Sequence, residues 1–238
     1  MPQTITGTAT GNVLTIVPVI SPSSCVKEDT LFFCNLSCYT DLKDTMEVER
    51  SMKVYTIIGG VNGTGKSSLT GVLRTQLKDL GRIIDVDKIT AENGLTPLEG
   101  GREALRRIRE CLDKNVCFTQ ETTLSGHRTE KTAAEAREKG YSVRLFYIGL
   151  DSPEECLARI ENRVRHGGHD IPEPDVLRRF AGRREAVAKI LPYCDEARFF
   201  DNDNGFAEVA EYLNGELLLK GVCRPQWIQE LSEYLKGK

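Results

Sequence analysis

The sequence has no C-x-x-C pair, no apolar run of transmembrane length and no large excess of either charge. Its eight cysteines are scattered, and Cys34-x-x-x-Cys38 has no matching second half, so neither a zinc site nor a disulfide scaffold is expected. Reduced, mostly buried thiols in a cytoplasmic protein fit this usage better. A membrane-spanning helix needs about 20 apolar residues in a row, so no membrane segment is predicted. The net charge of -3 gives no reason to expect nucleic acid as a partner.

The first fifty residues differ in character from the rest of this 238-residue chain. The apolar run at 13–20 is short and interrupted by Pro18, and the first basic side chain is Lys27, so the basic start of a signal peptide is missing. No strong helical or strand periodicity is present here. We therefore expect 1–51 to be a poorly ordered N-terminal extension, with the choice of start codon as one explanation, and 52–238 to form one α/β domain.

The strongest motif is the stretch Gly60–Ser67, which has the pattern G-x-x-x-x-G-K-[ST]. An apolar, β-rich run precedes it and helical spacing follows it, which is the context that a phosphate-binding loop requires. Glycines allow the backbone N–H groups to turn toward a phosphate, and the helix N-terminus adds a partial positive charge. Lys66 can bridge the β- and γ-phosphates of ATP, and the Ser67 hydroxyl can bind Mg²⁺. The residues expected to bind the nucleotide in this loop are Gly60, Val61, Asn62, Gly63, Thr64, Gly65, Lys66, Ser67 and Ser68.

Two acids close the short apolar segment 82–87, which predicts a buried strand. Ligands of open parallel sheets bind beyond the carboxyl ends of the strands, so Asp85 and Asp87 should face the same crevice as the phosphate-binding loop. Strand alternation predicts that the two carboxylates point the same way, with Asp87 further into the crevice. One of them could accept a proton from an attacking hydroxyl. A role as a helix N-cap or turn residue stays open for both.

An acid followed by hydroxyl side chains ends the next expected strand, 116–121. Glu121 can accept hydrogen bonds from the hydroxyls of a polyol or sugar, and Thr123 can donate or accept, so both are expected at the substrate. Caps for the following helix are the alternative for 122–125, but an acid that closes a buried strand is costly unless it is used.

Two arginine-bearing helices flank Gly167-Gly168, which predicts a lid near 160–184. Guanidinium groups suit the charge that spreads over a transferred phosphoryl group, and a closing lid excludes water. An exposed basic helix pair is the alternative. Beyond a further strand, Asn202 lies in a polar loop that could contact adenine or form an Asx turn. A β-hairpin with a type I′ turn at Asn214-Gly215 and a terminal helix are expected at the C-terminus.

Together these residues resemble the zeta-toxin-like P-loop kinases over about 52–200. The motifs that carry the resemblance are Gly60–Ser67, Ile84–Asp87, Glu121–Gly126, Arg163–Pro172 and Arg178–Phe180. The resemblance implies a parallel sheet of five or more strands flanked by helices, with ATP and Mg²⁺ as ligands. It implies Asp87 as the catalytic base, Lys66 and Ser67 at the phosphates and Mg²⁺, Glu121 with Thr123 at the sugar nucleotide, and Arg163 with Arg179 at the γ-phosphate.

The predicted function is therefore phosphoryl transfer from ATP to a hydroxyl of a small molecule. In the toxins that molecule is UDP-N-acetylglucosamine, phosphorylated on the sugar 3′-hydroxyl. This sequence has Ser125 and Gly126 where the toxins have an arginine-containing turn, so the acceptor stays open. A nucleoside, an antibiotic or an RNA end is another possible acceptor, and an ATP-binding regulatory protein without phosphotransfer is an alternative from a different class. No antitoxin partner can be inferred from one chain.

Overall fold

The computed structural model describes residues 52–222 and 224–237, so the expectation for 1–51 lies outside the described residues. The described part contains a seven-stranded sheet and eight α-helices. The strands are β1 (Val54–Gly59), β2 (Arg82–Asp85), β3 (Phe118–Thr122), β4 (Ser142–Gly149), β5 (Glu196–Asp201), β6 (Ala207–Leu213) and β7 (Glu216–Leu219). The helices are α1 (Lys66–Gln76), α2 (Val86–Glu92), α3 (Pro97–Lys114), α4 (Arg128–Glu138), α5 (Pro153–Arg165), α6 (Glu173–Ala181), α7 (Arg183–Ile190) and α8 (Gln226–Lys236).

The sheet has the order β2-β3-β1-β4-β5-β6-β7. The first five strands in this order are parallel to one another, and β6 and β7 add an antiparallel hairpin at one edge. Asn214 (φ 54°) and Gly215 (φ 87°) form the hairpin turn, because a type I′ turn needs positive φ at both central positions. The predicted α/β class is confirmed, with a sheet that is mixed rather than purely parallel.

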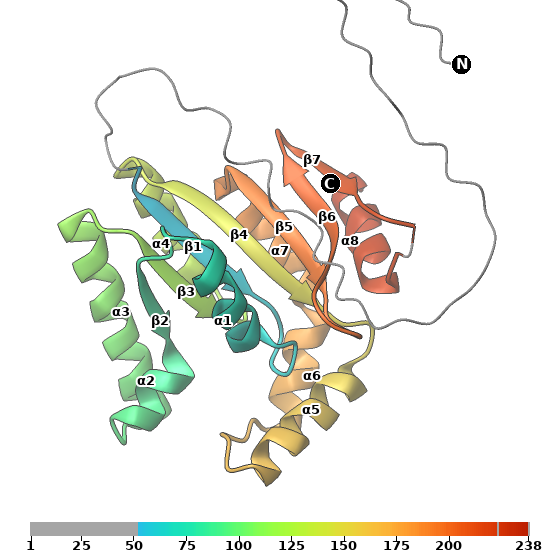
Figure 1. Cartoon of the computed structure of the whole chain (residues 1–238), viewed down its shortest axis with the longest axis horizontal. Coiled ribbons are helices and arrows are strands. Elements are labelled where there is room, and N and C mark those ends of the chain that lie inside the picture. The colour runs from blue at the N-terminus through green and yellow to red at the C-terminus, as the bar shows by residue number, and fades with distance from the viewer. Residues whose placement is uncertain (1–51, 223, 238) are drawn as a thin grey trace, which may run out of the picture. The chain divides into compact units, whose positions relative to one another are not determined.

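Helices cover the two faces of the sheet unequally. Helix α1 lies on one face, where Leu69 and Leu73 pack against sheet side chains that include Ile58 and Phe146. Helices α3, α4, α7 and α8 pack on the other face around a larger core that includes Tyr55. Figure 1 shows α1 in front of the sheet and α4, α7 and α8 behind it. Alternation along each strand therefore separates the side chains into two cores.

The topology brings the carboxyl ends of five parallel strands to one edge of the sheet, which lies toward the bottom of Figure 1. The phosphate-binding loop follows β1, and α2 begins directly after β2. The loop at Thr123 follows β3, α5 follows β4, and Asn202 follows β5. Since β3 and β4 flank β1 in the sheet, the phosphate-binding loop lies between the segments that carry the acids and the helices that carry the arginines.

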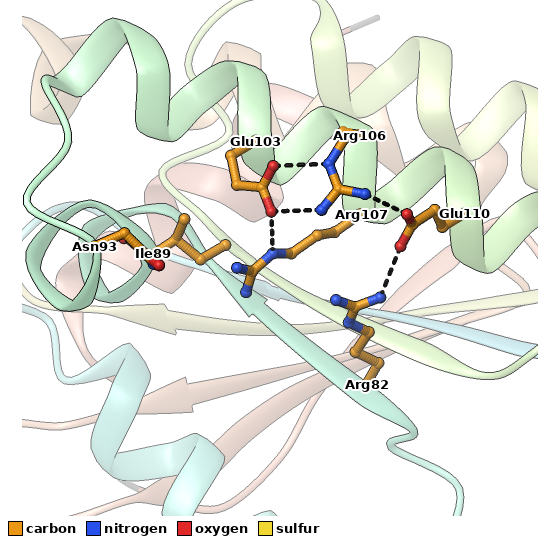
Figure 2. Close-up of polar contacts among 7 residues, drawn as sticks. All are labelled: Arg82, Ile89, Asn93, Glu103, Arg106, Arg107 and Glu110. Carbon is orange, nitrogen blue, oxygen red and sulfur yellow. Dashed lines mark hydrogen bonds and ion pairs between the residues drawn. The ribbon is translucent and has the colours of Figure 1, made fainter.

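Helix α3 is tied to the sheet by a chain of ion pairs (Figure 2). The Glu103 carboxylate accepts hydrogen bonds from Arg106 at 2.7 and 2.8 Å and from Arg107 at 2.7 Å. Arg106 also pairs with Glu110, which accepts a hydrogen bond from Arg82 of β2 at 3.0 Å. Arg106 and Arg107 of this helix are therefore both paired with acids.

Candidate active site

The backbone of the phosphate-binding loop depends on its glycines, of which Gly60, Gly63 and Gly65 all have positive φ. Gly63 (φ 86°) and Gly65 (φ 98°) are in the left-handed region. A Cβ at Gly63 would lie 2.4 Å from the Cys156 carbonyl oxygen, and one at Gly65 would lie 2.5 Å from Asn202 Nδ2. No side chain caps the N-terminus of the 11-residue α1, so its first N–H groups remain available to an anion. The loop therefore fits a phosphate chain.

Lys66 lies inside this loop. Its Nζ donates to the carbonyl oxygens of Gly60 at 2.9 Å and Val61 at 3.1 Å. Burial lowers the pKa of Lys66, and the nearby carboxylates of Glu121, Asp87 and Asp85 oppose that shift. The ammonium group is thus held close to three acids that come from the other side of the loop.

Glu121 is buried against the start of α1, with 7 % of its surface exposed. Its Oε2 accepts a hydrogen bond from Ser67 Oγ at 2.8 Å, and its Oε1 accepts one from Thr70 Oγ1 at 2.6 Å. Burial and the Asp85 carboxylate raise the pKa of Glu121. Glu121 therefore contacts Ser67, the serine expected to bind Mg²⁺.

Thr123 lies at the cavity described below, where its Oγ1 is 2.7 Å from Ser125 Oγ.

The expected strand 82–87 ends earlier than predicted. Asp85 closes β2 and is the N-cap of α2, since its Oδ1 accepts from the backbone N of Asp87 at 3.0 Å and of Lys88 at 3.3 Å. Burial raises the pKa of Asp85. Asp87 lies in the first turn of α2, so the prediction that strand alternation orients it was wrong. Among the described residues no hydrogen bond or ion pair holds the Asp87 carboxylate, which lies on the open side of the cavity.

One cavity of about 550 Å³ joins these groups, which we call the P-loop cavity. Its volume is in the range of small-ligand sites. It brings together all of the acids and arginines expected at the site: Asp85, Asp87, Glu121, Arg163 and Arg179. The other lining residues are Asn62, Gly63, Gly65, Lys66, Ser67, Ser68, Val86, Gln120, Thr122, Thr123, Arg159, Ile160 and Asn202.

Three arginines reach the cavity from α5 and α6, the helices of the predicted lid. Arg163 donates to the His169 carbonyl oxygen at 2.5 Å, and Arg179 Nη1 donates to Asn62 Oδ1 at 2.6 Å. The Nε of Arg179 is buried without a hydrogen-bond partner in the described part of the chain. A buried donor without a hydrogen-bond partner costs free energy. Arg159 was not predicted at the site, although it lies one helical turn before Arg163.

Asn202 lies beside the phosphate-binding loop. Its Nδ2 donates to the Thr64 carbonyl oxygen at 2.8 Å, which leaves the second amide hydrogen and the side-chain oxygen for a ligand. Arg159 donates to the backbone oxygens of Asn202 at 2.6 Å and Asp203 at 3.3 Å. The lid helix α5, the loop after β5 and the phosphate-binding loop are therefore connected.

The residues present fit ATP and Mg²⁺. The N–H groups, Lys66 and the arginines suit phosphate, and the Ser67 hydroxyl beside Glu121 supplies oxygens, which Mg²⁺ prefers. Within 52–222 and 224–237 no group of three or more His, Cys, Asp or Glu side chains could hold a metal by itself. Mg²⁺ is usually bound by one or two protein ligands together with substrate phosphates. No helix in the same residues is both long and apolar enough to cross a membrane.

Comparison with known proteins defines the class of this fold. No protein-family model matches the chain. A chain from the PezAT chromosomal toxin–antitoxin system of Streptococcus pneumoniae is similar, with a TM-score of 0.53 and 17 % identity over 79 % of this chain and 86 % of that one. The AvrRxo1-ORF1:-ORF2 complex with ATP gives a TM-score of 0.56 at 16 % identity, covering 76 % of this chain and 64 % of the AvrRxo1 chain, which is less than two thirds of its length. The fold is thus that of the zeta-toxin-like P-loop kinases.

A sequence relative gives the family itself. The chain is 34 % identical over 126 residues to an uncharacterized protein of Haemophilus influenzae, covering 51 % of this chain and 88 % of the relative. The chain belongs to the same family as this Haemophilus influenzae protein.

Proposed function

We propose that the protein is an ATP-dependent kinase that transfers the γ-phosphoryl group to a hydroxyl of a small molecule. The observation that carries the proposal is the single cavity shared by the phosphate-binding loop, the unpaired Asp87 carboxylate and the lid arginines. Phosphoryl transfer requires little more than positioning and electrostatic stabilisation, and these three groups supply both.

The residues take separate roles in this reaction. Lys66 and the N–H groups at the start of α1 bind the phosphates, while Arg163 and Arg179 stabilise the charge of the transferred group. Mg²⁺, when bound at Ser67, neutralises part of the phosphate charge. Asp87 accepts the acceptor's hydroxyl proton as that oxygen bonds to the γ-phosphorus and the bond from this phosphorus to the bridging oxygen of ADP breaks. Residues 160–184 act as the lid that excludes water.

The acid at position 87 provides the direct test. Asp87→Asn should abolish transfer while ATP still binds, because the amide keeps the shape and loses the base. Glu92→Gln is the matched control, since Glu92 lies on the same helix, pairs with Lys88 at 3.7 Å and does not line the cavity. Labelled ATP incubated with a metabolite extract should give a phosphorylated product with the wild type and with Glu92→Gln only. Normal turnover by Asp87→Asn would refute the assignment of the base.

The same experiment separates the other candidate functions. Slow ATP hydrolysis without any phosphorylated product would favour an ATP-binding regulatory protein. A product formed on RNA ends would be recognised by strongly salt-dependent binding, which a small sugar does not show. The sequence resemblance makes UDP-N-acetylglucosamine one acceptor to include.

A further inference from the structure

The P-loop cavity has two walls of opposite charge. The donor wall consists of the phosphate-binding loop and the lid helices α5 and α6, and all four cationic lining residues belong to it: Lys66, Arg159, Arg163 and Arg179. The acceptor wall consists of the lining residues from β2, α2, β3 and the loop after β3. These are Asp85, Val86, Asp87, Gln120, Glu121, Thr122 and Thr123. The sheet order places the lid arginines and the acids on opposite sides of β1, because β3 and β4 flank it, and the two walls meet at the phosphate-binding loop, where Glu121 accepts from Ser67.

The cations are anchored on their own wall. Arg159 donates to backbone oxygens of the loop after β5, Arg163 to the backbone of its own lid, and Arg179 to Asn62 of the phosphate-binding loop. Each guanidinium is thereby held where the phosphates of ATP are expected, and none is bonded to the acceptor wall.

The acceptor wall holds three carboxylates and no cationic lining side chain in the described residues. Burial raises the pKa of Asp85 and of Glu121; the Asp87 carboxylate adds to the first shift and the Asp85 carboxylate to the second, while Lys66 on the facing wall opposes both. The neutral residues between them, Gln120, Thr122 and Thr123, can hydrogen-bond to hydroxyl groups. A phosphate or diphosphate bound here would face like charges in a partly desolvated site, whereas hydroxyl or amino groups would find acceptors.

We propose that the acceptor of this kinase is a phosphate-free polyhydroxyl compound of sugar size, neutral or positively charged. This inference rests on the proposed function and adds the substrate class. It favours a free sugar or aminated sugar over a nucleotide-linked one, because the second would carry two phosphates onto an acidic wall.

The test is a series of acceptors that share one ring and differ in charge. Glucosamine is cationic, N-acetylglucosamine is neutral, and N-acetylglucosamine 1-phosphate and UDP-N-acetylglucosamine are anionic. We expect kcat/KM for transfer of labelled phosphate, measured at fixed salt, to be at least about tenfold higher for the better of the first two than for either of the last two. The reverse order would overturn the inference and leave the kinase intact.

Another ring could be the natural one, so a metabolite extract is incubated with labelled ATP in parallel, and the product is identified by mass spectrometry. A parent compound without phosphate supports the inference, and a phosphorylated parent overturns it. If ATP binds and no product forms in either experiment, the proposed function fails, and this inference fails with it.

A charge added to the acceptor wall gives an independent measurement. Thr123→Arg should raise kcat/KM for the phosphorylated members of the series relative to the unphosphorylated ones, by about tenfold or more. Thr75→Arg, at an exposed position of α1 outside the cavity, is the matched control and should leave the ratio unchanged. An unchanged ratio in a folded Thr123→Arg protein would contradict the charge argument.

Discussion

At the scale of single residues, replacing Asn202 can show whether this side chain contacts the nucleotide base or supports the phosphate-binding loop. Its side-chain nitrogen is bonded to the Thr64 carbonyl oxygen, so its loss should loosen the loop rather than remove an adenine contact. Asn202→Ala should weaken the binding of ATP, GTP and inorganic triphosphate to a similar degree, about fivefold, since one hydrogen bond contributes about 1 kcal/mol. Calorimetric titrations of the three ligands make the comparison.

The neighbouring loop residue Asn204 is the control for that measurement. It is exposed and its side chain donates to Asp203, so Asn204→Ala should change none of the three affinities. If Asn202→Ala weakened ATP alone and left GTP and triphosphate unchanged, Asn202 would be a base contact.

Arg179 is the arginine that the structure singles out, because its Nε is buried without a partner in the described part of the chain. A lysine keeps the charge and loses the planar set of donors, so Arg179→Lys should reduce kcat by about 10²–10³, the cost of removing one donor to developing charge. The adjacent Arg178 is exposed and pairs with Asp175, which makes Arg178→Lys the matched control. Equal kcat values for the two variants in steady-state assays would remove Arg179 from the mechanism.

The residues of the site were predictable where a local motif defines them and not where distant segments meet. The pattern at Gly60–Ser67 determines its own conformation, so Lys66 and Ser67 could be named from sequence alone. The position of Asp87 could not, because the Asp85 cap ends the strand two residues early. Arg159 reaches Asn202 across 43 positions, and Asn202 reaches Thr64 across 138, which no local pattern contains.

At the scale of elements, α3 owes part of its stability to charges that depend on pH. Hydrogen bonds from Arg106 and then Arg107 lower the pKa of Glu103 to about 2 (Figure 2). A carboxylate whose pKa is lower in the folded protein than in the unfolded protein stabilises the fold at pH values above its unfolded-state pKa. This stabilisation is lost as the pH falls toward its folded-state pKa. Glu103→Gln should therefore lower Tm slightly at pH 6, and the difference from wild type should shrink between about pH 4.5 and pH 2.

Salt is the second variable in that experiment. Because Glu103 is exposed to solvent screening, 1 M NaCl should reduce the Tm difference at pH 6. Glu138→Gln on α4 serves as the control and should show no such pH or salt dependence. A Tm difference that stayed constant down to pH 2 would exclude the ion pairs as its cause.

Element types were predicted better than element ends. From the sequence, Gly81 as a C′ residue predicts that the helix after the phosphate-binding loop ends near Leu80, but α1 ends at Gln76 because Leu77 is extended (φ -113°, ψ 128°), and Leu80 enters the core. The apolar spacing of 103–112 predicts an amphipathic helix there, and α3 begins six residues earlier, at Pro97. Its capping box between Thr96 and Glu99 starts α3 before the apolar pattern becomes visible. Caps and tertiary packing, rather than periodicity, decided both ends.

At the scale of the whole molecule, α8 links the segment before α5 to the sheet. The backbone N of Trp227 donates to Asp151 ahead of α5 at 2.8 Å, and its indole nitrogen donates to Asp201 at the end of β5 at 2.9 Å. The ring packs on Gly149, where a Cβ would lie 2.4 Å away. The sequence predicted this helix and its apolar side, but contacts over 26 and 76 positions were beyond any local pattern.

An ion pair joins α8 to the start of α7, and we expect it to help hold the predicted lid against the sheet. Arg183 follows Gly182 directly after the helix that carries Arg179, and it donates to Glu230 of α8 at 2.8 Å with side chains only 13 % and 28 % exposed. Glu230→Gln leaves a partly buried guanidinium without its counter-charge. This should lower the free energy of unfolding by about 1–3 kcal/mol, and Tm by roughly 2–4 °C for each kcal/mol.

Trp227 is the chain's one tryptophan, so its fluorescence follows the unfolding of this region. Glu233→Gln, at an exposed position of α8, should leave Tm unchanged. A double-mutant cycle with Arg183→Ala isolates the pair, and additive effects of the two substitutions would show that α8 does not hold the lid through this contact.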